Sequence, residues 1–212
     1  MSEMYLKKAN KNPETGTSET RKIVEKMLTE IEVGREDTAR KYAEDLDGFT
    51  CEVIISKEQI DQASKLVPQK LKDDIKFAHE RIKKFAEAQK SSINEFETEL
   101  SPGLWAGQKL IPIETAGCYV PGGRYAHVAS AIMSITTARV AGVENIIACS
   151  APKGEEGPNP AILYTMNYCG ADTILALGGV QAIASMAFGL FTGLPAKILV
   201  GPGNKFVAEA KR

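Results

Sequence analysis

Apolar residues in the first half of the chain recur at helical spacing. Ser18-Glu19-Thr20 opens a predicted helix, in which apolar residues recur at helical spacing until Gly34: Ile23, Val24, Met27, Leu28 and Ile31. Residues 37–46 predict a second short helix. Ser56 predicts the start of a third helix, and the amphipathic run over about 68–95 predicts a fourth. The first half of the chain is therefore expected to be largely helical.

Two stretches of the first half have a β-like pattern instead. The sequence CEVIIS, residues 51–56, is rich in β-branched residues. Residues 96–115, FETELSPGLWAGQKLIPIET, alternate apolar and polar positions on both sides of Pro102-Gly103, which predicts two strands around a turn. We place a boundary after this pair. A helical region with a small strand element, 1–115, then precedes a second domain, 116–212.

The second half alternates continuous apolar runs with helical segments. The runs GCYV, NIIACS, TILAL and KILVG are each followed by a predicted helix, at 127–141, 159–169, 180–189 and 204–212. Strands that are apolar throughout are buried on both faces, and their alternation with helices is typical of a parallel sheet. The sequence thus predicts an α/β fold in which a Rossmann-like parallel sheet, about 116–212, follows the helical region.

Composition changes this picture little. The 212 residues are 43% hydrophobic and 25% charged, and the net charge of −1 gives no electrostatic reason to expect nucleic acid or an anionic membrane as partner. No apolar run suits a membrane span or a signal peptide, so we expect a cytoplasmic protein. The four cysteines form no C-x-x-C pair, and Cys118, Cys149 and Cys169, which sit in apolar segments, are expected to be small buried hydrophobic residues. Cys149 ends a strand and remains an alternative catalytic thiol, but no histidine lies near it in the sequence.

Three of the four predicted strands end in a glycine turn: YVPGG, ALGG and VGPGN. In an open parallel sheet, ligands bind outside the carboxyl ends of the strands. Glycine lets a ligand approach the backbone, and the helix that follows offers free N–H groups to phosphate. We therefore expect Gly122-Gly123, Gly178-Gly179 and Gly201–Gly203 to line one binding edge. None of the turns spells G-x-G-x-x-G or a P-loop.

Polar residues beside these turns are the candidate ligand contacts. Tyr119, Gln181 and Asn204 each carry a phenol or amide that could hold a ribose or nicotinamide edge, although Asn204 could equally serve only as a helix cap. Arg124 offers a fork for a bidentate anion such as a carboxylate, phosphate or sulfonate, and His127 could exchange a proton or bind substrate. A surface ion pair for Arg124 and a helix start for His127 are the alternatives.

At these turns the sequence resembles a known family. The blocks GCYVPGGRYAHVASAIMSITTARVAGVENI, ALGGVQAIASMAFG and KILVGPGNKFVAEAKR are similar, in order and spacing, to those of the histidinol dehydrogenase family, and the resemblance extends over nearly the whole chain. It implies a zinc-dependent homodimer that oxidises an alcohol with NAD. It also implies that the NAD contacts fall on Tyr119, Gln181 and Asn204.

The stretch after the first glycine pair departs from the biosynthetic members, which oxidise histidinol through the aldehyde to histidine. Those members usually have a small residue after the glycines and a proline-serine pair later, whereas this chain has Arg124-Tyr125-Ala126-His127. That sequence, together with YLKKA, TSETR and LKDDIKFAHERIKKFAEAQ, is similar to the sulfopropanediol 3-dehydrogenase branch, which oxidises dihydroxypropanesulfonate to sulfolactate. We expect Arg124 or His127 to hold the anionic group of the substrate.

Metal-binding and catalytic residues are not expected in this chain. It has two histidines, no H-E-x-x-H and no Cys/His cluster. The resemblance implies that the zinc ligands and a catalytic glutamate-histidine pair come after Arg212, so the chain is expected to be the N-terminal half of a dehydrogenase. Two other functions stay open: oxidation of histidinol itself, and a non-catalytic nucleotide-binding or dimerisation module.

Overall fold

The helical first region is confirmed. The computed structural model describes residues 18–122 and 125–212. The helices of the first region are α1 (Ser18–Asp47), α2 (Lys57–Leu66) and α3 (Gln69–Ser91). The two predicted N-terminal helices are the two arms of α1, which is interrupted at Arg35, where φ is 53°. Ser56 opens α2 through a capping box, in which its Oγ accepts from the backbone N–H of Gln59 and the Gln59 side chain accepts from the N–H of Ser56.

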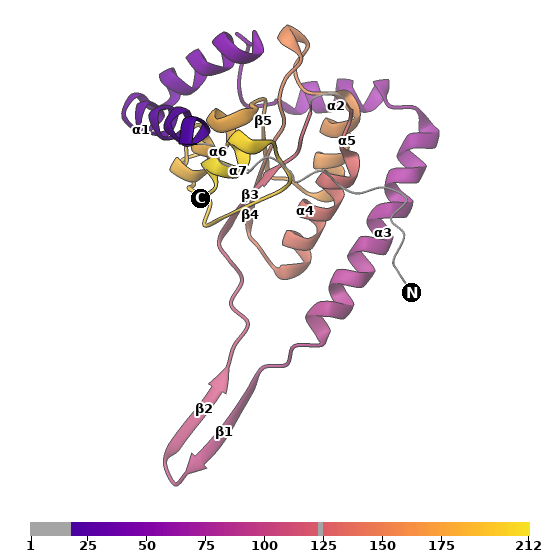
Figure 1. Ribbon diagram of the computed structural model, residues 1–212. Helices are drawn as coiled ribbons and strands as arrows, with labels where there is room; N and C mark the ends of the chain where they lie inside the picture. The colour runs from indigo at the N-terminus through magenta and orange to yellow at the C-terminus, as the bar shows by residue number, and fades with distance from the viewer. Residues whose placement is uncertain (1–17, 123–124) are drawn as a thin grey trace, which may run out of the picture.

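The predicted strand pair forms an antiparallel hairpin of β1 (Phe96–Ser101) and β2 (Leu104–Gln108), which projects away from the rest of the molecule (Figure 1). Every residue of both strands is exposed. The CEVIIS stretch forms less β-structure than its composition predicts. Ile54 makes an isolated antiparallel bridge with Leu175, and the extended run stops at Ser56 because the capping box there starts a helix.

The second region is an alternation of strands and helices, as predicted. Its elements are β3 (Thr115–Tyr119), α4 (Val128–Ala141), β4 (Asn145–Cys149), a 3₁₀ turn η1 (Gly154–Glu156), α5 (Pro160–Cys169), β5 (Thr173–Leu175), α6 (Gly179–Phe188), β6 (Ile198–Val200) and α7 (Lys205–Ala210). The four strands pair in parallel in the order β5-β4-β3-β6. Strands β4 and β5 are therefore added on one side of β3, and β6 is added on its other side. The direction in which strands are added reverses at this point, between β3 and β6.

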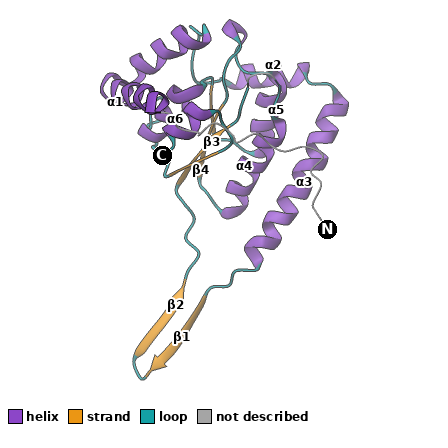
Figure 2. Ribbon diagram, viewed as in Figure 1, coloured by secondary structure: helices purple, strands orange, loops and turns teal. Residues whose placement is uncertain are grey.

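Alternate residues of the strands face two different helical layers, which Figure 2 shows on either side of the sheet. Ala116, Cys118 and Ile146 belong to the core beneath α4 and α5, onto which α3 and α2 pack in turn. Tyr119 and Ile147 belong to the core beneath α6, against which α1 and α7 pack. Because both faces are covered, the two central strands, β3 and β4, are buried along nearly their whole length. No helix in the described ranges has the length and hydropathy needed to cross a membrane.

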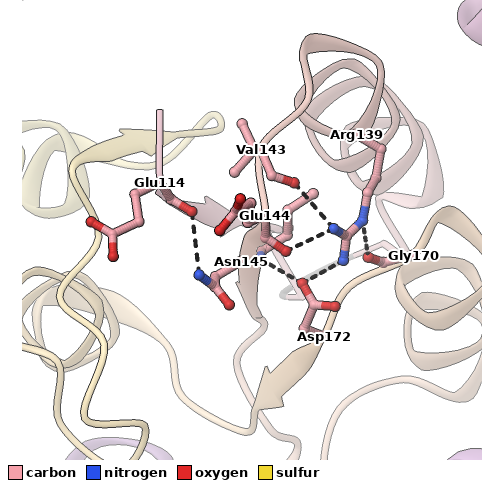
Figure 3. A network of polar contacts seen from close by, with 8 residues as sticks. Glu114, Arg139, Val143, Glu144, Asn145, Gly170 and Asp172 are labelled. Atoms are coloured by element: carbon pink, nitrogen blue, oxygen red, sulfur yellow. Dashed lines mark hydrogen bonds and ion pairs between the residues drawn. The ribbon is translucent and has the colours of Figure 1, made fainter. Parts of the chain in front are cut away.

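A polar network ties the elements together at the amino ends of the strands (Figure 3). Arg139, in the last turn of α4, donates to the carbonyl oxygens of Gly170, Val143 and Glu144 at 2.8, 3.1 and 2.9 Å. Its guanidinium also pairs with the carboxylate of Asp172, which accepts a hydrogen bond from the backbone N–H of Ile146 at 2.7 Å. This network lies at the edge opposite the glycine turns and is structural.

Candidate functional site

The carboxyl ends of β3 and β6 open onto a cavity of about 700 Å³. It is lined by the three predicted glycine turns together with residues from both arms of α1. Four of the predicted site residues lie in its lining: Tyr119, His127, Gln181 and Asn204. The fifth, Arg124, and its neighbour Gly123 lie outside the described residues. The volume is within the range of sites for small molecules and cofactors.

Tyr119 is the last residue of β3, and its ring is packed into the core below α6. Its hydroxyl accepts a hydrogen bond from the backbone N–H of Gly179 at 3.3 Å. Burial raises the pKa of the phenol to about 12, so Tyr119 is neutral at physiological pH. A neutral phenol keeps its own proton free to donate to a ligand in the cavity.

Gln181 lies in the first turn of α6 and is almost completely buried, with 1% of its surface exposed. Its Nε2 donates to Oδ2 of Asp47 at 2.9 Å. Its Oε1 has no hydrogen-bond partner in the described part of the chain. A buried amide oxygen without a partner costs about 1–3 kcal/mol, which makes it a natural place for a ligand donor.

Asn204 performs the capping role that the sequence left open. Its Oδ1 accepts from the backbone N–H groups of Phe206 and Val207 at 3.0 and 3.1 Å, at the start of α7. The cap fixes the amide, so its oxygen is engaged and its nitrogen is the group left to meet a ligand. His127 takes the N-cap position of α4 without a side-chain capping bond and is exposed at the rim of the cavity.

Close backbone approach explains the glycine turns. Gly201 has φ of 117°, and a Cβ on it would lie 2.0 Å from the carbonyl oxygen of Tyr119. A Cβ on Gly122 would lie 2.7 Å from the carbonyl oxygen of Ala151. Any larger residue would push the first turn away from its neighbours. The glycines thus allow the turns after β3, β4 and β6 to pack together at the switch point.

Asp47 is the lining residue that sequence reasoning missed. It ends α1, is half-buried in the cavity wall, and carries the carboxylate that Gln181 contacts from 134 positions away. Burial raises the pKa of this carboxyl, while the hydrogen bond from Gln181 opposes the shift. A carboxylate at a helix end is ordinary in a sequence, and no local pattern signals that this one reaches α6.

The described residues do not fit a zinc ion. They include no group of three or more His, Cys, Asp or Glu side chains close enough to hold a metal. His79 lies on α3, packed edge-on against Tyr168 with ring centroids 5.1 Å apart, and it does not line the cavity. Cys149 is completely buried, and burial strongly raises the pKa of its thiol, which argues against the alternative of a catalytic thiolate.

Comparison with known proteins identifies the family of this chain. The family model described as "Histidinol dehydrogenase" matches residues 10–212. The chain belongs to the histidinol dehydrogenase family. Members of this family are NAD-dependent dehydrogenases that act on CH–OH groups.

Relatives and a solved structure extend this finding. A histidinol dehydrogenase homolog of Pelagibacter ubique is 57% identical over 98% of this chain and 49% of its own length. A sulfopropanediol 3-dehydrogenase of Ruegeria pomeroyi is 54% identical over 98% of this chain and 48% of its own length. The crystal structure of histidinol dehydrogenase from Elizabethkingia anophelis superposes with a TM-score of 0.87 at 32% identity, covering 94% of this chain and 46% of that one. The chain spans about half the length of the curated relatives it matches.

Proposed function

We propose that this protein is the cofactor-binding part of an NAD-dependent dehydrogenase that oxidises a small polar alcohol. One observation carries the proposal: Tyr119, Gln181 and Asn204, which come from three separate strand-to-helix turns, line a single cavity at the switch point of the sheet. Ligands of open parallel sheets bind at this place. Gln181 lines this cavity, and its buried Oε1 has no hydrogen-bond partner among the described residues, as in a site built to receive a ligand donor.

The three side chains offer complementary hydrogen-bonding groups to a dinucleotide. Tyr119 offers a phenol proton, Gln181 an amide oxygen and Asn204 an amide nitrogen. Ile23, Met27 and Phe206 add apolar wall, which excludes water from one side of the cavity. Bound NAD would supply a hydride acceptor there. The chain's own residues would bind the cofactor, fix its orientation and keep water away from it.

For the substrate, we propose 2,3-dihydroxypropane-1-sulfonate, oxidised to sulfolactate. The similarity to a relative named sulfopropanediol 3-dehydrogenase and the Arg124–His127 stretch support it. His127 lies at the cavity rim, where it could meet an anionic group. L-Histidinol is the second candidate, and it is favoured by the family and by the structural match to a histidinol dehydrogenase.

We also propose the properties that the family resemblance implies beyond the described residues: a zinc ion with ligands after Arg212, a homodimer, and a cytoplasmic location. The described residues contain no group of side chains that could hold the zinc ion, so its ligands would have to come from outside them. A non-catalytic nucleotide-binding or dimerisation module remains the third candidate, because Tyr119, Gln181 and Asn204 are hydrogen-bonding groups and none of them is a general base.

NAD titration by isothermal calorimetry tests the cofactor proposal. Replacing Tyr119 by Phe, or Gln181 by Met, should weaken NAD binding about fivefold to tenfold, since each removes about one hydrogen bond. Tyr125→Phe is the matched control, because Tyr125 is 75% exposed and does not line the cavity. Equal affinities for the wild type and both cavity variants would contradict the proposed site.

NADH formation with each alcohol and zinc, measured on a protein that also carries the residues proposed to follow Arg212, separates the three candidate functions. Turnover of the sulfonated diol with little turnover of histidinol supports the first, and the reverse supports the second. NAD binding without turnover of either alcohol supports the binding module. Arg124→Ala should raise KM for the sulfonate, and an unchanged KM would remove Arg124 from the substrate site.

A further inference from the structure

A half-buried carboxylate, that of Asp47, holds the amide of Gln181, which is one of the proposed cofactor contacts. Asp47 is the last residue of α1, and its Oδ2 holds the Nε2 of Gln181 at 2.9 Å. Both arms of α1 pack with α6 and the turn after it in one apolar cluster, all with 0% exposure: Ile31 from the first arm, Ala39 from the second, Ala184 from α6 and Leu190 just after it. The small side chains of Ala39 and Ala184 let the two helices approach closely. The carboxylate is therefore held in place by a rigid helix pair.

This is a costly position for a carboxylate. The C-terminal end of a helix carries the negative end of its dipole, which disfavours an anion. Asp47 is half-buried, and none of the ion pairs in residues 18–122 and 125–212 involves it. Asn would fit the same space and would accept the same hydrogen bond from Gln181 without the charge. An ionisable group at a position that disfavours its charge is a candidate for a role in function.

The role follows from what the carboxylate does to the amide. An amide can be turned either way, but an ionised carboxylate only accepts hydrogen bonds, so it binds the Gln181 nitrogen and excludes the oxygen from that side. The oxygen is then directed toward the turn before α6, where a Cβ on Gly179 would lie 3.0 Å from Oε1. Within residues 18–122 and 125–212, this oxygen has no hydrogen-bond partner.

We propose that Asp47 is a positioning residue that locks the Gln181 amide with its oxygen toward the glycine turn, so that the cavity selects a ligand presenting an N–H or O–H donor at that point. The inference rests on the proposed function, since the ligand is taken to be NAD. Its donor is the nicotinamide carboxamide N–H or a hydroxyl or amino group of the ADP-ribose part. Asp47 itself does not touch the ligand.

Calorimetric titration of the 212-residue protein with NAD and with ADP-ribose tests this. Asp47→Asn lets the Gln181 amide turn, so NAD should bind about tenfold more weakly while the thermal unfolding midpoint is not lowered. Asp45→Asn is the matched control, since Asp45 is an exposed carboxylate on the last turn of the same helix, and it should change neither quantity. An equal loss with ADP-ribose places the donor in the ADP-ribose part, and no loss with ADP-ribose places it on the nicotinamide.

A double-mutant cycle shows whether Asp47 acts through Gln181. In a Gln181→Met background, Asp47→Asn should cause no further loss of NAD affinity. Asp47→Asn with wild-type affinity would overturn the inference and leave the cofactor proposal standing. An undiminished loss in the Gln181→Met background would also overturn it, because Asp47 would then contact the ligand directly. A wild-type protein that binds no NAD would overturn both.

Discussion

Replacement of Arg139 by Met should remove the polar network at the amino edge of the sheet with little change in packing. Methionine keeps the aliphatic stem that covers the end of α4 but has no donor. The change deletes three hydrogen bonds to carbonyl oxygens and the ion pair with Asp172. It also leaves the Asp172 carboxylate with the backbone N–H of Ile146 as its remaining bond in Figure 3.

The expected cost is about 3 kcal/mol of unfolding free energy. The two part-buried bonds, to Gly170 and Val143, contribute about 1 kcal/mol each, at the low end for charged donors because water can reach part of the site. The exposed bond to Glu144 adds about 0.5 kcal/mol. The ion pair adds about 0.5 kcal/mol, because its side chains are 32% and 46% exposed and solvent screens them.

Urea unfolding followed by far-ultraviolet circular dichroism measures this loss, and the m value should not change. In a chain of this size, 3 kcal/mol corresponds to a fall in melting temperature of about 6–12 °C. Lys83→Met is the control, since it breaks an exposed pair with Glu87 at 3.9 Å and should cost less than about 0.5 kcal/mol. Arg139→Met with a loss below about 1 kcal/mol would refute the reasoning that this network holds the helix ends to the sheet.

Three further outcomes are expected. Gly201→Ala should destabilise the protein by more than about 2 kcal/mol in urea unfolding and weaken NAD binding. Gly193→Ala is the control, because Gly193 also has a positive φ, 70°, but faces open space, and it should cost about 1 kcal/mol. Equal costs for the two variants would contradict the close contact between Gly201 and Tyr119. Ellman's reagent should label one thiol, Cys51, in the native protein and four in denaturant, because Cys118, Cys149 and Cys169 are buried; a second fast thiol would contradict this. Burial raises the folded-state pKa of Asp47, so the unfolded chain ionises first. The wild type should then lose stability relative to Asp47→Asn as pH rises from about 4 through the folded pKa, and a gain with rising pH would reverse the sign we infer.

The fold could be predicted from the sequence where local rules decide it. The α/β alternation, the helix start at Ser56 and the helix ends at Gly142, Gly170 and Gly189 follow from periodicity and capping, and all are present. The interruption of α1 lies at Arg35, one residue after the glycine that predicts it. The β-like CEVIIS stretch forms only a bridge, because its pairing depends on the edge of a strand more than a hundred residues later.

The same division applies to the candidate site. The sequence alone predicts that three side chains lie at one edge of the sheet: those of Tyr119, Gln181 and Asn204. Parallel strands place their carboxyl ends at the same edge, whatever the details of the packing. Asp47 could not be placed in this way. Its position depends on the apolar fit between α1 and α6, which is a contact between surfaces and leaves no motif in either segment. Residues whose positions follow from the topology of the fold can thus be predicted from the sequence. A residue that orients them through tertiary packing can be found only in the structure. The experiments on Asp47 therefore test the part of the site that the structure alone supplies.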